Sequence, residues 1–210
     1  MTITPLTGHL RTMRYYLFPA FAALIGAGVA GAQTTARVTA GVTGGTALVH
    51  DELGGPISLG AGRPVTIALA ITHPIGAKYR LLIEGRVGRA NVNVDDSGVQ
   101  SDLESLTTVG AMLLVDGPFA GAFRWEIGAG VLSYRPADQR GVFLQGGPSP
   151  WLLGAGLSWS RPMGGSGLRL LANARYDFHQ FQTRQLESRG YSQYRTVHRV
   201  GLGVGIERRF

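Results

Sequence analysis

His179 and His198 are the two residues best suited by type to act as a general base. A histidine that activates a serine hydroxyl is a common arrangement for ester hydrolysis. On an extended strand the serine would lie two residues away, because alternate residues share a face. Glutamine and phenylalanine follow His179, whereas arginine and valine follow His198. We therefore predict no catalytic residues and a protein that is not an enzyme.

Four acidic residues, Asp95, Asp96, Asp102 and Glu104, lie close together in one polar stretch. Carboxylates of this kind could bind a divalent cation, but their spacing fits no defined metal-binding loop. The chain has no cysteine, which excludes thiolate metal sites and disulfides. Its glycines form no phosphate-binding G-x-G-x-x-G motif between a strand and a helix. We predict a solvated acidic loop, no bound metal and no cofactor.

The other charged residues mostly occupy one face of extended segments, alternating with apolar residues. The basic members are Arg37, Lys78, Arg80, Arg86, Arg124, Arg169, Arg175, Arg199 and Arg209, and the acidic ones are Glu84, Glu126, Asp177 and Glu207. Charges that share a confined interior need partners, because desolvating a single charge is costly. We predict an interior ion-pair network in which Asp177 bridges Arg175 and Arg199. At one end of it, Glu207 should lie between Arg169 and Arg37.

The elements that must position these charges are β-strands, because the dominant hydrophobic period is two. Alternation marks the segments 36–43, 64–72, 78–88, 107–115, 122–134, 151–160, 168–178 and 198–210. These are about eight strands of the length that a tilted strand needs to cross a bilayer. Tight turns are expected at Pro74-Ile75-Gly76, Asp116-Gly117-Pro118 and Gly164–Gly167, and longer polar loops at 48–62, 89–105, 135–149 and 180–193.

The apolar face of these strands is too continuous to fit inside a narrow soluble barrel, so we expect it to face lipid. Aromatic residues on this face gather near the strand ends, as expected for membrane interfaces. They are Tyr79, Phe123, Trp125, Trp159 and Phe210 on one side and Trp151 and Phe178 on the other. The glycines on the opposite, inward face would leave room for long arginine side chains.

The N-terminal segment has the features of a Sec-type signal peptide. Arg11 and Arg14 precede an apolar run over 15–30, and Ala30-Gly31-Ala32 stands before Gln33. We predict a signal peptide over 1–32, cleaved between Ala32 and Gln33, and a barrel domain over 33–210. An uncleaved membrane anchor is the alternative, and Met13 is an alternative start. No other window holds about 18 consecutive apolar residues.

The net charge of +7 could favour binding to nucleic acid. The arginines are scattered singly, however, and form no basic stripe with interleaved aromatic residues. We therefore expect no nucleic-acid partner.

Residues 33–210 resemble the small OmpA/OmpX-like outer-membrane β-barrels. The resemblance rests on the signal peptide, the strand pattern and a last strand in which Val204, Ile206 and Phe210 fall on the same face. Arg208, which falls on that face too, interrupts its apolar pattern. It implies an all-β fold, an eight-stranded antiparallel up-and-down transmembrane barrel, in the outer membrane of a diderm bacterium. Val204, Ile206 and Phe210 would then form the signal read by the barrel-assembly machinery. Outer-membrane lipid and lipopolysaccharide would surround a monomer.

The function expected from this resemblance is non-enzymatic. The protein would serve envelope structure or surface contact, with a largely filled polar lumen and an extracellular loop ligand that the sequence does not identify. A narrow pore or transporter for small solutes, an outer-membrane enzyme that modifies lipid A and a soluble periplasmic barrel are the alternatives.

Overall fold

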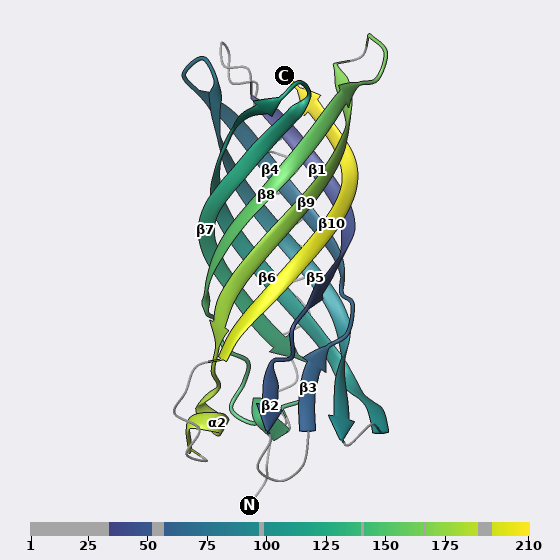
Figure 1. Ribbon diagram of the computed structural model, residues 1–210, viewed down its shortest axis with the longest axis vertical. Coiled ribbons are helices and arrows are strands. Elements are labelled where there is room, and N and C mark those ends of the chain that lie inside the picture. The colour runs from purple at the N-terminus through teal and green to yellow at the C-terminus, as the bar shows by residue number, and fades with distance from the viewer. Residues whose placement is uncertain (1–33, 52–56, 97–98, 140, 166, 189–194) are drawn as a thin grey trace, which may run out of the picture.

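The computed structural model describes residues 34–51, 57–96, 99–139, 141–165, 167–188 and 195–210, and these residues form a closed β-barrel (Figure 1). Its eight long strands are β1 (Thr35–Gly45), β4 (Val65–Ile75), β5 (Tyr79–Asp96), β6 (Val99–Ala120), β7 (Phe123–Pro136), β8 (Trp151–Pro162), β9 (Leu168–Phe181) and β10 (Arg195–Arg209). Each pairs antiparallel with its neighbours in this series. All eight predicted strands and their up-and-down order are confirmed.

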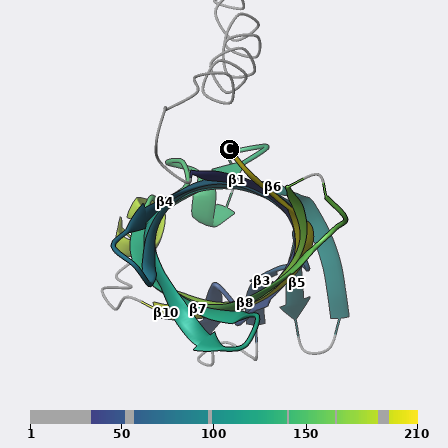
Figure 2. The ribbon, with the colours of Figure 1, turned by 90° about the horizontal axis from the view of Figure 1, so that it is seen from above.

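The barrel closes where the last strand pairs with the first. β10 runs antiparallel to β1, and Arg37 lies opposite Glu207 in their register. At the end of this seam the backbone N–H of Phe210 donates to the carbonyl of Thr34 at 3.0 Å. The view down the barrel axis in Figure 2 shows the resulting ring of strands. Closure leaves none of these eight strands with an unpaired edge, as a barrel in a membrane requires.

Short turns join the strands at the rim that carries Phe210. They lie between β4 and β5, between β6 and β7, and between β8 and β9; Gly76, Gly121 and Gly164 have positive φ angles there. The turn expected at Asp116-Gly117-Pro118 is wrong, because β6 continues to Ala120 and the chain reverses at Gly121. Aspartate, glycine and proline favour turns, but the pairing of β6 with β7 extends through them.

The opposite rim carries the longer connections, which contain more structure than expected. The short strands β2 (Val49–Asp51) and β3 (Ile57–Ala61) lie between β1 and β4, the 3₁₀ turn η1 (Gly141–Phe143) between β7 and β8, and the helix α2 (Arg184–Ser188) between β9 and β10 (Figure 1). β5 and β6 continue as a ribbon through most of the predicted loop 89–105. Polar residues there alternate with Val92 and Val94, which suits a strand with one solvent-facing side.

The two faces of the barrel wall differ in polarity as the strand pattern predicted. The outward face carries exposed apolar side chains from every strand, including Val38, Val42, Val65, Ile67, Ile83, Val87, Leu113, Ile127, Val131, Leu153, Leu157, Leu170, Val200, Leu202, Val204 and Ile206. On β10, for example, Leu202 is 61% exposed whereas Glu207, on the inward face, is 2% exposed. None of the helices in the described part of the chain is long and apolar enough to span a bilayer.

Candidate functional site

The lumen nearer the short turns is organised around Asp116, which is completely buried. Its carboxylate accepts hydrogen bonds from three arginines on three different strands. The closest contacts are Arg80 Nη2 at 2.5 Å, Arg124 Nη2 at 2.8 Å and Arg37 Nη2 at 3.2 Å. Asp116 was not among the predicted luminal charges, because the sequence Asp116-Gly117-Pro118 predicts a turn. The available signal was its phase, since Asp116 follows Met112 and Leu114 on the inward face.

Arg37 extends this cluster across the barrel. Its Nε donates to Glu207 at 2.6 Å and its Nη1 to Glu126 at 2.8 Å, so it binds three acids together with Asp116. Arg169 Nε lies 3.9 Å from Glu207, which therefore sits between Arg37 and Arg169 as expected. Arg37 is 6% exposed, and its complete set of acidic partners offsets the cost of burying it.

Arg175 connects the cluster to the middle of the barrel. Its Nη2 donates to Glu126 at 3.0 Å, and its Nη1 contacts Glu84. Glu126 is thus shared by Arg37 and Arg175, and the four side chains form a continuous chain of ion pairs. All four are buried.

Asp177 forms a separate pair with Arg86, whose Nη1 lies 2.7 Å from Asp177 Oδ2. The expected bridge from Asp177 to Arg175 and Arg199 is wrong. In the β9–β10 register Arg175 lies opposite Gly201 and Arg199 opposite Asp177, two residues from the expected pairing. The expected pairing placed the centre of the β9–β10 connection near residue 187. An error of one residue in that centre shifts the register between the two strands by two residues.

Glycines on the inward face provide space for these charged side chains. A Cβ atom added at Gly110 would lie 3.1 Å from both Cγ and Nε of Arg86, and one at Gly154 would lie 2.4 Å from Asp177 Oδ1. Larger residues at either position would displace the Arg86–Asp177 pair.

The lumen nearer the long connections is apolar and aromatic, which the sequence reasoning did not predict. Tyr134 stacks edge-on against Phe181, and its hydroxyl lies 2.6 Å from His179 Nε2. Phe181 in turn contacts Phe143 of η1. Leu48, Leu106, Leu132, Leu152, Leu186 and Val197 complete this outer cap. His179 is thus buried in the cap, whereas His198 lies on the exposed outer wall, where its Nδ1 is 2.5 Å from the Tyr176 hydroxyl.

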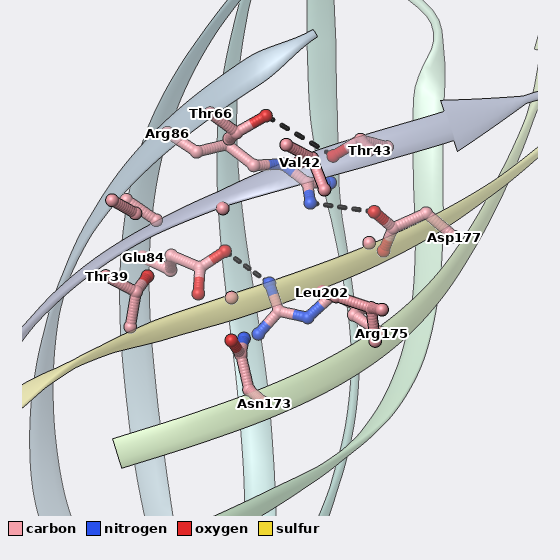
Figure 3. Close-up of a pocket in the computed structure, with 15 residues that line it drawn as sticks. Thr39, Val42, Thr43, Thr66, Glu84, Arg86, Asn173, Arg175, Asp177 and Leu202 are labelled. Carbon is pink, nitrogen blue, oxygen red and sulfur yellow. Dashed lines mark hydrogen bonds and ion pairs between the residues drawn. The ribbon is translucent and has the colours of Figure 1, made fainter. Parts of the chain in front are cut away.

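Two small cavities lie inside the barrel, between the charged network and the outer cap. The larger, of about 50 Å³, is lined by the Arg86–Asp177 and Arg175–Glu84 pairs together with small residues of β1, β4 and β10 (Figure 3). The smaller, of about 20 Å³, lies beside Arg199 and shares Thr43 with the first. Cavities of this size hold a few water molecules at most.

The remaining predicted residues lie at the rims, on the outer wall or outside the described part of the chain. Lys78 lies in a turn, and Lys78 and Arg209 are exposed. Val204, Ile206 and Phe210 lie on the exposed outer side of the last strand or just beyond it. Ala32, Gln33 and the side chains of Asp95, Asp96, Asp102 and Glu104 are outside the described residues. Elsewhere, where the structure describes side chains, no group of three or more histidines and acids could hold a metal ion.

No protein-family profile and no curated protein matches the sequence. The structure is similar to the outer membrane protein OprG from Pseudomonas aeruginosa, with a TM-score of 0.54 and 13% identity over 85% of this chain and 96% of OprG. It is also similar to the outer membrane protein AlkL, solved in lipid bilayers (TM-score 0.55, 12% identity, 85% of this chain and 90% of AlkL).

A third similar structure is a major outer membrane protein from Thermus thermophilus, with a TM-score of 0.51 and 13% identity over 86% of this chain and all of that one. At these identities the likeness is one of fold. The chain therefore has the fold of the small eight-stranded outer-membrane β-barrels, and the resemblance inferred from the sequence is confirmed at that level.

Proposed function

We propose that this protein is an integral, non-enzymatic outer-membrane protein that serves envelope structure or surface contact. The observation that carries the proposal is the belt of exposed apolar side chains around a closed barrel. Such a belt would be a large aggregation-prone patch in water but is the expected surface in lipid. Tyr79 and Phe123 near the short turns and Trp151 near the long connections would lie at the two interfaces.

The proposal includes export and assembly. Cleavage of residues 1–32 would give a mature protein that begins at Gln33, which the intact mass of the membrane-extracted protein would reveal. Val204, Ile206 and Phe210 would serve as the recognition element for the barrel-assembly machinery. The short turns would face the periplasm and the long connections the outside, where they would meet lipopolysaccharide and a surface ligand.

A membrane position predicts a depth-dependent cost for a charge on the outer wall. We expect Leu202→Arg, in the middle of β10, to lower the free energy of unfolding in lipid vesicles by about 2–4 kcal/mol. Ile206→Arg, nearer the rim, should cost less because its guanidinium can reach the headgroups. Urea titrations of the refolded variants would measure both values. Equal costs for the two variants in vesicles would argue against the membrane position.

A filled lumen predicts that the protein does not conduct as an open pore does. The proposal of a filled lumen is supported by the ion pairs that occupy the part of the lumen nearer the short turns and by the aromatic cap that occupies the part nearer the long connections. We expect no steady conductance of porin size after insertion into planar bilayers. A steady open current would instead support the narrow-pore alternative, and a changed lipid A mass in cells that express the protein would support the enzyme.

A further inference from the structure

The outer half of the lumen contains a buried cation with an incomplete set of partners. Arg199 is 8% exposed, and its Nη1 has no hydrogen-bond partner within the described part of the chain. The acid opposite it in the register is Asp177, whose Oδ2 binds Arg86 at 2.7 Å and whose Oδ1 forms no hydrogen bond with Arg199. Arg199 makes no ion pair within 4.0 Å with the residues described here. A buried guanidinium without a counter-charge destabilises a fold strongly.

Arg199 lines the smaller cavity, of about 20 Å³, and is the only charged group among the described residues that do so. The other lining groups are hydroxyl-bearing or apolar, and include Thr43, Thr46, Leu106, Tyr134 and Val197. The site therefore offers a positive charge and polar hydrogens but no carboxylate.

The larger cavity differs in this respect. Its two arginines, Arg86 and Arg175, are matched by two acids, Asp177 and Glu84 (Figure 3). Its unpartnered buried atoms include both a donor, Arg175 Nε, and acceptors, Asp177 Oδ1 and Asn173 Oδ1. Water can satisfy both kinds of atom, so the larger cavity requires nothing else.

We propose that Arg199 and the smaller cavity form a binding site for one small monovalent anion of the size of chloride. The volume is about that of one or two water molecules, which excludes phosphate, sulfate and the carboxylates of larger ligands. Thr46 Oγ1 accepts a hydrogen bond from the backbone N–H of His198 at 3.1 Å, so its own hydroxyl hydrogen is available to the anion. Gly45 contributes by its size, since a Cβ there would lie 2.9 Å from the backbone oxygen of His198 and 3.3 Å from Arg199 Cγ.

The test is the dependence of stability on the identity of the anion. The full barrel is unfolded by urea in an uncharged detergent, in potassium chloride or in potassium gluconate at the same ionic strength; gluconate is too large for the cavity. We expect the wild-type midpoint to be higher in chloride, with a difference that keeps rising with the logarithm of the chloride concentration once that concentration exceeds the dissociation constant. Arg199→Met keeps an unbranched chain without the charge and should show equal midpoints in the two salts.

Arg63→Met is the matched control, because Arg63 is exposed and lies between Gly62 and Pro64, which line the same cavity. It removes the same charge and should keep the wild-type chloride effect. Equal unfolding midpoints of the wild type in the two salts would mean that water fills the cavity, and would overturn the proposal. An Arg199→Met variant whose unfolding midpoint is still higher in chloride would also overturn it. If Arg199→Met does not refold, a measurement on the wild type tests the proposal. The ³⁵Cl NMR line should broaden in a saturable way when the protein is present, and bromide but not gluconate should reverse the broadening. Absence of such broadening would overturn the proposal.

Discussion

Asp116→Asn should lower the free energy of unfolding by about 3–5 kcal/mol, the loss typical when one member of a buried charge set is removed. Asp116 is fully buried and is the shared acceptor for Arg37, Arg80 and Arg124. The asparagine keeps the shape of the side chain, so the loss measures the charge. Neutralising it leaves three guanidinium groups crowded around a neutral amide. Urea titration of protein refolded in detergent micelles would give the value.

Glu187→Gln is the control for Asp116→Asn, because Glu187 is an exposed acid on α2, outside the barrel wall. It should change the free energy of unfolding by about 0.5 kcal/mol or less, as surface substitutions usually do. If Asp116→Asn were as mild as Glu187→Gln, the three arginines would have to be hydrated rather than held by the carboxylate.

The strand architecture could be predicted from the sequence because a barrel wall has two faces of different polarity. Leu202, Val204 and Ile206 must point outward if Glu207 points inward, since the side-chain period in a strand is two. This alternation specifies the face of each residue without any knowledge of the neighbouring strand. It also identified most of the charged residues that line the lumen, with Asp116 as the exception.

The pairing of luminal charges could be predicted only in part, because it depends on register. The position of Glu207 between Arg37 and Arg169 was predicted correctly, because β1 and β10 are the terminal strands and must pair with each other to close the barrel. Asp177 instead forms an ion pair with Arg86 of β5. The register between β9 and β10 gives no information about β5. Contacts across the lumen depend on shear and on side-chain reach, which a strand pattern does not record.

Local composition gave a wrong prediction at Asp116 and no prediction of the outer cap. Asp116-Gly117-Pro118 has turn residues, yet the pairing of β6 with β7 holds it in a strand. The cap depends on Phe143 in η1 and Leu186 in α2, which reach the lumen from the long connections. Such contacts between loops and barrel have no periodic signature.

Arg175→Met should be the second strongly destabilising change, again by about 3–5 kcal/mol. Arg175 is 8% exposed and separates two buried acids, Glu84 and Glu126. Without it, Glu84 has no ion-pair partner among the residues that the structure describes, and Glu126 retains only Arg37 there. Because the cost comes from acids left unpaired, adding Glu84→Gln to Arg175→Met should restore part of the stability. A double-mutant cycle measured by urea titration would give the coupling between the two residues.

Arg169→Met provides the matched control on the same strand and the same face of β9. The Arg169 side chain is 36% exposed, donates to Ser160 at 2.9 Å and lies 3.9 Å from Glu207. Its removal should cost about 1 kcal/mol or less, because a solvated pair contributes little. The two arginines thus share charge, strand and orientation and differ in burial. Equal losses for Arg175→Met and Arg169→Met, with no coupling to Glu84, would mean that water screens the mid-barrel charges and that the lumen is not filled by its ion pairs.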